Sequence, residues 1–286
     1  MDDARHAPTA APSEIHPSAA IAPGAVIGRG CRIGPGCVVG AGVTLEDGVE
    51  LVAHVVVDGI TRIGAGARIF PFASIGLAPQ DLKYKGEPTR CEIGPRTLVR
   101  EHATIHRGSV GGEGVTRVGA DCMIMAVAHV AHDCVLGDRV ILANNVMLGG
   151  HVEIGDTVFV GGGTAIHQFV RIGRQAVIGG MSGVEADVIP FGSAMGNRAR
   201  LIGLNLIGLR RRGFSRAQIH ALRAAFRMLF RDPGVFAERL QAVEERFADD
   251  PNIAEVLAFI RAPSRRGLVR VGRAAPEEEA GEEAEG

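Results

Sequence analysis

The sequence predicts a mainly β fold, a parallel β-helix followed by a small α-helical domain, on the basis of three observations. Aliphatic residues recur at every sixth position from Ile15 to Val184. Glycine is abundant at 40 residues and aromatic residues make up only 4% of the chain, so small and branched side chains must fill the core. Beyond Pro190 the apolar period changes to three and four residues, which is typical of amphipathic helices.

The six-residue repeat is strict. Steps of six from Ile15 meet only Ile, Val or Leu as far as Ile75, and the register resumes at Ile93. It slips by one residue across GSVGGEG and then runs without exception from Val118 to Val184. Each hexad therefore predicts one short strand and one corner, and three hexads close a turn of about 18 residues. A β-sandwich alternates every second residue and would not keep a period of six.

Small residues follow the aliphatic positions in two ways. Gly often comes directly after the aliphatic, as in IGRG and VGAG, where we expect it to permit the left-handed or tight backbone of a corner. A small or β-branched residue lies four positions after the aliphatic, and four of the five cysteines take this inward position: Cys31, Cys37, Cys122 and Cys134. We expect these cysteines to be packing residues, because their spacing shows neither a CxxC pair nor a disulfide framework.

The coils are interrupted once and then end. Residues 76–92 (GLAPQDLKYKGEPTRCE) leave the repeat without changing its register, and such an excursion is a usual place for function. Ser215 and Gln218 form a capping-box signature ahead of a helix. Other helices are expected over about 204–212, over about 235–247 and after Asp250-Pro251. The predicted organisation is a disordered extension over 1–13, a β-helix over 14–195, an α-helical domain over 196–273 and an acidic disordered tail over 274–286.

Composition excludes several classes of protein. The net charge of −1 argues against nucleic-acid or membrane-surface binding. The N-terminus lacks a signal-peptide pattern and no apolar run has transmembrane length, so a cytoplasmic protein without membrane insertion is expected. Residues 196–273 nevertheless carry 16 Arg against seven acidic residues, a basic balance that could attract an acidic partner.

Histidines gather in the middle coils: His102, His106, His129, His132, His151 and His167. An 18-residue turn places His132, Gly150 and Gln168 in one outward column, and Asp133 directly follows His132. An imidazole beside a carboxylate on a free face is a candidate general base. Zinc is the competing use of clustered histidines, but the turn does not bring three imidazoles to one ion, so no metal is expected.

A second column on a different face contains only small residues: Asn144, Gly162 and Gly180. It is compatible with a groove for an apolar chain and with close packing of another subunit.

Several motifs resemble one family. They are the excursion QDLKYKGEPTR, the runs TIHRGSV, AHVAHDCVLG and ILANNVMLGGHV, the triplet His167-Gln168-Phe169 and the helix start GLRRRGFS. Over about residues 14–270 the chain resembles the UDP-N-acetylglucosamine O-acyltransferases of lipid A biosynthesis. The resemblance implies a left-handed coil and a homotrimer with active sites between prisms. It also implies transfer of an (R)-3-hydroxyacyl chain from acyl carrier protein to the 3-hydroxyl of UDP-N-acetylglucosamine.

The resemblance also implies roles for individual residues. His132 would be the general base, Asp133 would orient it, and the Gly150 N–H would bind the thioester oxyanion. Substrate-contacting positions would be Gln80, Asp81, Lys83, His129, His151, His167, Gln168, Asn205, Arg211 and Arg212. Gly180 would end the acyl groove, which suggests a chain near C14. Ile207 replaces a Glu that some members carry, so one nucleotide contact is expected to be missing.

We therefore predict direct acyl transfer without a covalent intermediate, cofactor or metal, with the basic C-terminal domain attracting acyl carrier protein. Three alternative functions remain open. The N-acyltransferase of the same pathway normally has a further N-terminal domain, whereas here the hexads begin at Ile15. A zinc hydratase on the same solenoid would contain metal, and a non-catalytic scaffold would not need the polar column.

Overall fold

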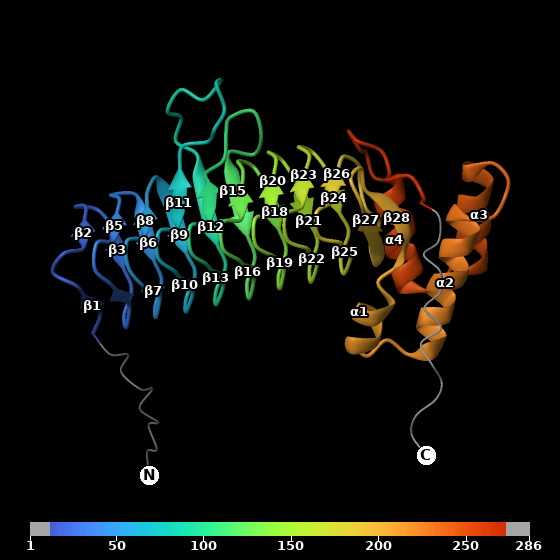
Figure 1. Cartoon of the computed structure of the whole chain (residues 1–286), viewed down its shortest axis with the longest axis horizontal. Coiled ribbons are helices and arrows are strands. Elements are labelled where there is room, and N and C mark those ends of the chain that lie inside the picture. The colour runs from blue at the N-terminus through green and yellow to red at the C-terminus, as the bar shows by residue number, and fades with distance from the viewer. Residues whose placement is uncertain (1–11, 273–286) are drawn as a thin grey trace, which may run out of the picture.

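The structure, a computed structural model, describes residues 12–272. It is a straight stack of coils with helices packed at its C-terminal end (Figure 1). Of the predicted disordered extension over 1–13, only residues 12 and 13 are described, and the Ser13 hydroxyl is hydrogen-bonded to Gly28 and Cys31 of the first coils. The predicted acidic tail over 274–286 lies outside the described residues.

Three sheets form the sides of this prism, and each turn of the coil adds one strand to each sheet. Sheet A contains β1 (Glu14–Ile15), β4 (Arg32–Ile33), β7 (Glu50–Leu51), β10 (Arg68–Ile69), β13 (Leu98–Val99), β16 (Met123–Ile124), β19 (Ile141–Leu142), β22 (Phe159–Val160), β25 (Val177–Ile178), β27 (Gly192–Met195) and β28 (Arg200–Leu204). Sheet B contains β2 (Ala20–Ile21), β5 (Val38–Val39), β8 (Val56–Val57), β11 (Ser74–Leu77), β14 (Thr104–His106), β17 (His129–Val130), β20 (Met147–Leu148), β23 (Ala165–Ile166) and β26 (Gly183–Val184). Sheet C contains β3 (Val26–Ile27), β6 (Val43–Leu45), β9 (Ile60–Ile63), β12 (Arg90–Ile93), β15 (Val115–Val118), β18 (Val135–Leu136), β21 (Glu153–Ile154) and β24 (Arg171–Ile172).

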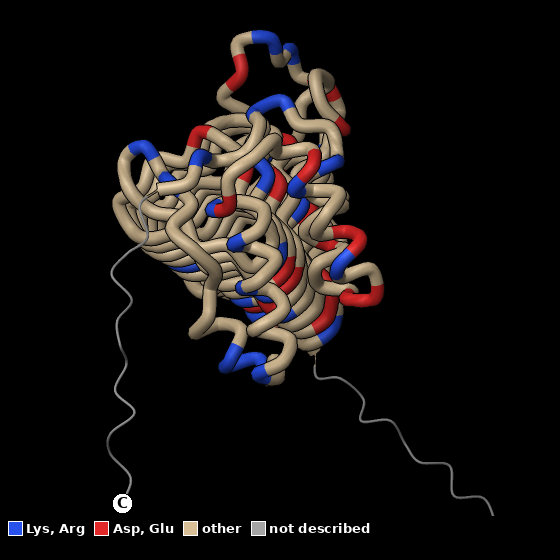
Figure 2. Tube along the Cα trace, turned by 90° about the vertical axis from the view of Figure 1, so that its right-hand side faces the viewer, with Lys and Arg blue, Asp and Glu red and all other residues tan. Residues whose placement is uncertain are grey.

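The hexad aliphatics form the core of the prism. Every one of them from Ile33 to Val184 is at most 3% exposed, and all five cysteines are buried thiols. Strands pair in parallel with offsets of 18 residues, for example Met147 with Ala165, which is the turn length that the hexads predict. A buried aliphatic side chain contributes about 1.5–3 kcal/mol, so the stacked core stabilises the coil. The mainly β fold class is confirmed. Viewed from the helical end, the coils superimpose and basic and acidic residues alternate along the stack (Figure 2).

Glycine has a different role at the corners from the one expected. Glycines directly after the aliphatic are required by close approach of the next coil, because a Cβ on Gly34 would lie 1.8 Å from the Val52 carbonyl oxygen. The left-handed residue comes two positions later, as at Gly36 with φ of 66°. Non-glycine residues also take this position, including Asp133 and His151. The corner therefore needs glycine mainly for space between coils.

Two excursions leave the coil at the corner between sheets B and C. In the first, Ile63 pairs with Ile93, so twelve residues are added to an 18-residue turn, and two whole hexads leave the register unchanged. In the second, Ile93 pairs with Val118, so seven residues are added. The one-residue slip expected across GSVGGEG is in fact this second excursion, because seven residues are one hexad plus one. Both excursions project from the same edge of the stack (Figure 1).

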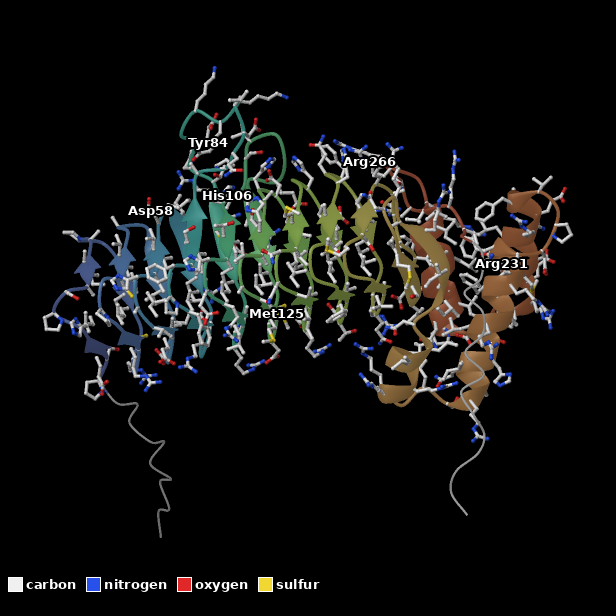
Figure 3. All side chains as sticks on the ribbon, viewed as in Figure 1. Asp58, Tyr84, His106, Met125, Arg231 and Arg266 are labelled. Carbon is white, nitrogen blue, oxygen red and sulfur yellow. The ribbon has the colours of Figure 1, made fainter. Side chains whose placement is uncertain are left out.

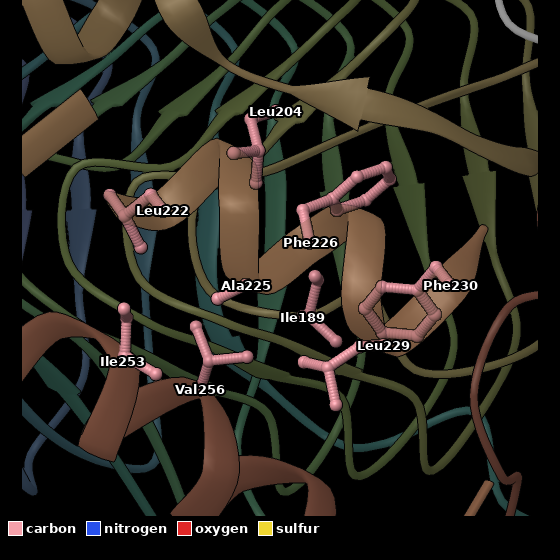
Figure 4. A pocket seen from close by; sticks show the side chains of 9 residues that line it. All are labelled: Ile189, Leu204, Leu222, Ala225, Phe226, Leu229, Phe230, Ile253 and Val256. Carbon is pink, nitrogen blue, oxygen red and sulfur yellow. The ribbon is translucent and has the colours of Figure 1, made fainter. Parts of the chain in front are cut away.

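The helices begin and end near the predicted positions. They are α1 (Leu206–Arg211), α2 (Arg216–Phe230), α3 (Phe236–Arg246) and α4 (Pro251–Arg261). Ser215 and Gln218 form the predicted capping box of α2. Strand β28 lies within the region predicted to be helical, because its antiparallel pairing with β27 closes the edge of sheet A. An apolar pocket between α2, α4 and the last coil is lined by residues such as Ile189, Leu204 and Phe226 (Figure 4). No helix in the described part of the chain is long and apolar enough to cross a membrane.

Candidate active site

The corner between sheets B and C, called here the B/C corner, carries the predicted catalytic column. It joins β17 to β18, β20 to β21 and β23 to β24, so His132, Gly150 and Gln168 follow one another from coil to coil. The backbone confirms the column, because the His151 N–H donates to the His132 carbonyl and the Phe169 N–H donates to the Gly150 carbonyl. Both excursions leave the coil at this corner.

His132 and Asp133 form a hydrogen-bonded pair. The His132 Nδ1 lies 2.8 Å from the Asp133 Oδ2. The Asp133 side chain is 2% exposed and the His132 side chain is 17% exposed, so the carboxylate is enclosed while the imidazole reaches the surface. The Asp133 N–H donates to the Thr116 hydroxyl on β15. The pair has the geometry of a general base held by an orienting carboxylate.

The second excursion encloses this carboxylate. Ser109 donates its N–H to both oxygens of Asp133, at 3.1 and 3.0 Å, and its hydroxyl to Oδ2 at 2.7 Å. Gly112 packs so closely that a Cβ there would lie 2.5 Å from the Asp133 Cγ. Burial on its own would raise the pKa of Asp133, but the hydrogen bonds from His132 and Ser109 outweigh it and hold the pKa below its ordinary value. Asp133 is therefore ionised at neutral pH and accepts the Nδ1–H of His132.

This hydrogen bond determines the tautomer of His132. With the proton on Nδ1, the free lone pair is on Nε2, at the outer edge of the ring. Gly150 borders this edge, since a Cβ on Gly150 would lie 2.7 Å from Nε2. Among residues 12–272 the Gly150 N–H has no hydrogen-bond acceptor. A proton acceptor and a free N–H donor therefore lie next to each other.

Replacing Gly150 by Ala is expected to lower activity by at least about tenfold without unfolding the coil. The new Cβ would come within 2.6 Å of the His132 Cε1 and force the imidazole away from Asp133. Steady-state turnover and the melting temperature measure the two effects separately. The matched control is Gly203→Ala, where a Cβ meets no atom within 4 Å. Equal activity of both variants would contradict the expected effect on His132.

A second column lies beside the first and contains the left-handed corner residues Asp133, His151 and Phe169. His151 Nε2 is 3.9 Å from the Asp133 Oδ2, and the His151 ring is edge-on to the His132 ring at 5.1 Å. Phe169 stacks on His151 at 4.5 Å. Burial lowers the pKa of His151, and the opposing effect of Asp133 does not cancel this. His151 is therefore a neutral, ordered neighbour of the base.

The C-terminal segment reaches the same corner. Arg266 donates from Nε to the Gln168 carbonyl at 2.8 Å and contacts the ring of His167. Arg265 lies over the Phe169 ring, with its Cζ 4.4 Å from the centroid. Figure 3 shows Arg266 on the same edge of the stack as His106 and Tyr84. The sequence identified His167 and Gln168 as site residues but gave no indication of the two arginines.

The ring of His129, a predicted substrate-contacting residue, contacts two residues of the neighbouring strand β14 in sheet B. Its Nδ1 is 2.7 Å from the Thr104 hydroxyl, and its ring meets the ring of His106 edge-on at 4.9 Å. Burial lowers the pKa of His129. Burial also lowers the pKa of His106 to about 4, with smaller effects from His129 and His132. The Nδ1 of His106 has no hydrogen-bond partner within the described residues.

Stability is expected to fall on acidification because of His106. An unfolded chain protonates histidine near pH 6.5, whereas the folded chain resists protonation of His106 until about pH 4. The unfolded state thus binds more protons in this window, and native stability is lost as the pH falls through it. We expect this residue to remove about 2 kcal/mol between pH 7.5 and pH 5, measured by urea unfolding. His106→Gln should lose correspondingly less over the same range, and an identical loss would assign the effect to other groups.

The first excursion places the predicted substrate loop above the B/C corner. Asp81 accepts from the Lys83 N–H at 2.9 Å and from the Tyr84 N–H at 3.0 Å, so the loop is turned tightly. Arg107 donates to the Tyr84 hydroxyl at 2.9 Å and anchors the loop to β14. Gln80 and Lys83 are exposed. These side chains are positioned to meet a ligand from outside the prism.

The other predicted residues lie at other corners. Asn144, Gly162 and Gly180 follow one another between sheets A and B. Asn205 caps α1 by accepting from the Gly208 N–H and donates to the Gln175 carbonyl, and Arg212 donates to the Thr157 carbonyl. Gln175 and Thr157 lie between sheets A and C. Arg211 and Ile207 are exposed on α1. Within one chain, the structure therefore does not bring these residues to His132.

The side chains of His132, Asp133 and His151 approach one another more closely than the sequence suggested. Their possible ligand atoms all lie within 4.8 Å of one another, so the cluster contains two imidazoles and a carboxylate. A zinc ion needs ligand distances near 2 Å. The His132 Nδ1 and Asp133 Oδ2 already bond each other, and the Ser109 hydroxyl donates to the same oxygen. The arrangement fits an oriented base better than a cation site.

Comparisons with known proteins agree with the hexapeptide coil. Residues 12–41, 24–59 and 115–150 match the bacterial transferase hexapeptide model, and residues 187–269 match the second domain of Udp N-acetylglucosamine O-acyltransferase. The acyl-[acyl-carrier-protein]–UDP-N-acetylglucosamine O-acyltransferase of Caulobacter vibrioides is 52% identical over 254 residues, which cover 89% of this chain and 97% of that protein. The enzyme of the same name from Azorhizobium caulinodans is 52% identical over 225 residues, covering 79% and 83%.

Solved structures give the same result. The UDP-N-acetylglucosamine O-acyltransferase of Moraxella catarrhalis has a TM-score of 0.87 at 43% identity, covering 90% of this chain and 99% of that one. The Arabidopsis acyltransferase has a TM-score of 0.80 at 37% identity, covering 90% and 100%. The three-sided coil and the match to the bacterial transferase hexapeptide model place the chain among the hexapeptide-repeat transferases. The chain belongs to the acyl-[acyl-carrier-protein]–UDP-N-acetylglucosamine O-acyltransferase family.

Proposed function

We propose that the protein transfers an (R)-3-hydroxyacyl chain from acyl carrier protein to the 3-hydroxyl of UDP-N-acetylglucosamine, the first step of lipid A biosynthesis. The observation that carries this proposal is the His132–Asp133 pair beside the free Gly150 N–H, in a chain 52% identical to enzymes named for this reaction. The relatives do not support the N-acyltransferase or zinc hydratase alternatives.

The geometry supports a direct transfer. The His132 Nε2 takes the proton of the sugar hydroxyl as its oxygen attacks the thioester carbonyl, and Asp133 stabilises the imidazolium that forms. The Gly150 N–H donates to the oxyanion, and the thiol of the carrier arm leaves with a proton from His132. Cys134 is the nearest thiol in sequence, but burial raises its pKa to about 12 and excludes it as a nucleophile. The chemistry needs no covalent enzyme intermediate.

A homotrimer would complete the site. The catalytic pair, the small-residue column and the α1 arginines lie at three different corners of one prism, so only neighbouring copies can bring them together. Exposed apolar side chains follow the corner between sheets A and B and its flanks: Phe72, Val127, Met147, Phe159 and Met181. Such a strip is typical of a surface that packs against protein or an acyl chain. Analytical ultracentrifugation tests the trimer, and a monomeric active enzyme would contradict it.

The small-residue column is proposed as the acyl groove. Asn144, Gly162 and Gly180 follow one another at the corner between sheets A and B, with the exposed Phe159 on the sheet A side and the exposed Met147 on the sheet B side. Gly180 is exposed, and a Cβ there would lie 3.1 Å from the Gly162 carbonyl oxygen, so a larger side chain fits only by projecting outward. The proposed groove would therefore be longest with glycine at this position.

Gly180→Met is expected to shift the preferred chain from about C14 toward about C10. The added thioether would fill the end of the groove and exclude several methylenes, each worth about 0.8 kcal/mol of burial. A competition assay with carrier substrates of graded length measures the shift. Gly203→Met, distant from the groove, is the control. A wild-type preference for C10 over C14 would overturn the chain-length proposal itself.

The charge of the C-terminal region supports the carrier as acyl donor. The region 196–273 has nine more basic than acidic residues, and acyl carrier proteins are acidic, so the helices would attract the carrier. We place the reaction in the cytoplasm, where both substrates are made. The decisive experiment incubates the protein with UDP-N-acetylglucosamine and hydroxyacyl carrier proteins. Formation of the 3-O-acyl sugar nucleotide supports the proposal, and transfer only to a 3-amino sugar would overturn it.

A further inference from the structure

The segment after α4 returns to the B/C corner and is held there by the backbone. The Asp187 N–H donates to the Gly267 carbonyl at 2.8 Å, and the Val269 N–H donates to the Asp187 carbonyl at 2.9 Å. The Ser264 hydroxyl accepts from the N–H groups of Arg266 and Gly267, which closes a tight turn. The turn presents Arg265 and Arg266 side by side at the end of the catalytic columns.

The two arginines make different kinds of contact. Arg266 is engaged with the Gln168 carbonyl and the His167 ring, so it fastens the turn to the coil. Arg265 is exposed, and no carboxylate among the described residues pairs with it. Its guanidinium lies over the face of the Phe169 ring, and its charge contributes to lowering the pKa of His151. A guanidinium stacked on a ring keeps its in-plane N–H donors free for a planar or tetrahedral anion.

The position of Arg265 relative to His132 restricts which ligands it could bind. Arg265 continues the column of Asp133, His151 and Phe169, and three contacts of 4.4, 4.5 and 5.1 Å connect its guanidinium to the His132 ring. An extended molecule with its reactive end at His132 could therefore place an anionic group at Arg265. Both substrates of the proposed reaction carry such a group, the diphosphate of the sugar nucleotide and the phosphodiester of the carrier's pantetheine arm.

We propose that Arg265 is a phosphate-binding residue of the active site, held in place by Arg266 and Phe169, and that it binds a phosphate oxygen of a substrate whose reactive end lies at His132. The assignment to a substrate rests on the proposed acyl transfer. Arg265 would act in binding and not in proton transfer, so its loss should raise a dissociation constant or a KM and leave kcat nearly unchanged.

The test compares Arg265→Gln with Arg265→Lys and with the control Arg270→Gln, which removes an exposed charge from the same segment. One arm measures UDP-N-acetylglucosamine binding by calorimetry without the carrier. The other measures KM for acyl carrier protein and for an acyl-pantetheine donor that lacks the phosphate. We expect Arg265→Gln to weaken the binding of one phosphate-bearing substrate about tenfold, which is the usual contribution of a charge-assisted hydrogen bond. Arg265→Lys should restore part of this affinity.

The possible outcomes distinguish the two phosphate groups and the two proposals. Weaker sugar-nucleotide binding would show that Arg265 binds the diphosphate. A raised KM for the carrier, with the phosphate-free donor unaffected, assigns the pantetheine phosphodiester. Both constants within twofold of wild type, an equal loss in Arg270→Gln, or a lowered melting temperature with unchanged constants would overturn the proposal. An inactive wild type would contradict the proposed function alone, because calorimetric titration of UDP-N-acetylglucosamine, and of the carrier in place of its KM, still reports on Arg265.

Discussion

His132→Ala is expected to lower turnover by at least about 100-fold, the usual weight of a general base. The imidazole takes the proton of the attacking hydroxyl, and no other side chain at the B/C corner can replace it. His151 is the nearest candidate, but it is held against the Phe169 ring and its Nε2 faces Asp133. The single-turnover rate with saturating substrates measures the effect on the chemical step, and the melting temperature shows that the coil is intact.

The matched control is His102→Ala. His102 belongs to the same predicted histidine cluster, but it stacks on Phe72 at the corner between sheets A and B. Its removal should leave the chemical step within about twofold of wild type. Near-normal turnover of His132→Ala, or equal losses in both variants, would overturn the assignment of the base.

Asp133→Asn is expected to lower turnover by about 10² to about 10⁴-fold while the fold persists. The carboxylate Oδ2 accepts both from the Ser109 hydroxyl and from the His132 Nδ1–H, and Oδ1 accepts from the Ser109 N–H. An asparagine has a single acceptor oxygen, so its NH₂ group must face either the Ser109 N–H or His132. When the NH₂ group faces His132, the imidazole carries its proton on Nε2, the atom that must accept the proton from the sugar, so the base is in the wrong tautomer.

The size of the KM change distinguishes this mechanism from a loss of binding. We expect Asp133→Asn to change kcat far more than KM, because Asp133 is enclosed and does not reach a ligand. Asp138→Asn is the control, since Asp138 also accepts a backbone N–H, from Ala120, but touches no imidazole. A KM effect with normal kcat would place Asp133 in substrate binding instead.

The coil, its core and the first column of the site can all be predicted from the order of the residues alone. A period of six needs no tertiary information, because each aliphatic must face inward wherever its coil lies, and every hexad aliphatic from Ile33 to Val184 is buried. Because Gly150 follows His132 by 18 residues, which is one turn, the two residues lie at equivalent positions of neighbouring coils. The capping box of α2 is equally local, since Ser215 and Gln218 satisfy each other's backbone groups. Handedness does not follow from such a repeat, and the family resemblance supplied it.

The surroundings of the base depend on how distant parts of the chain meet in the folded protein. The enclosure of Asp133 by Ser109 depends on where a seven-residue excursion folds, and the hexad register records such an insertion only as a slip of one. The placement of Arg265 over Phe169 joins residues almost a hundred positions apart, by way of backbone pairing that leaves no periodic pattern. Repeats specify contacts between equivalent positions of neighbouring coils. Contacts made by excursions and by a returning chain end depend on the three-dimensional path of the chain.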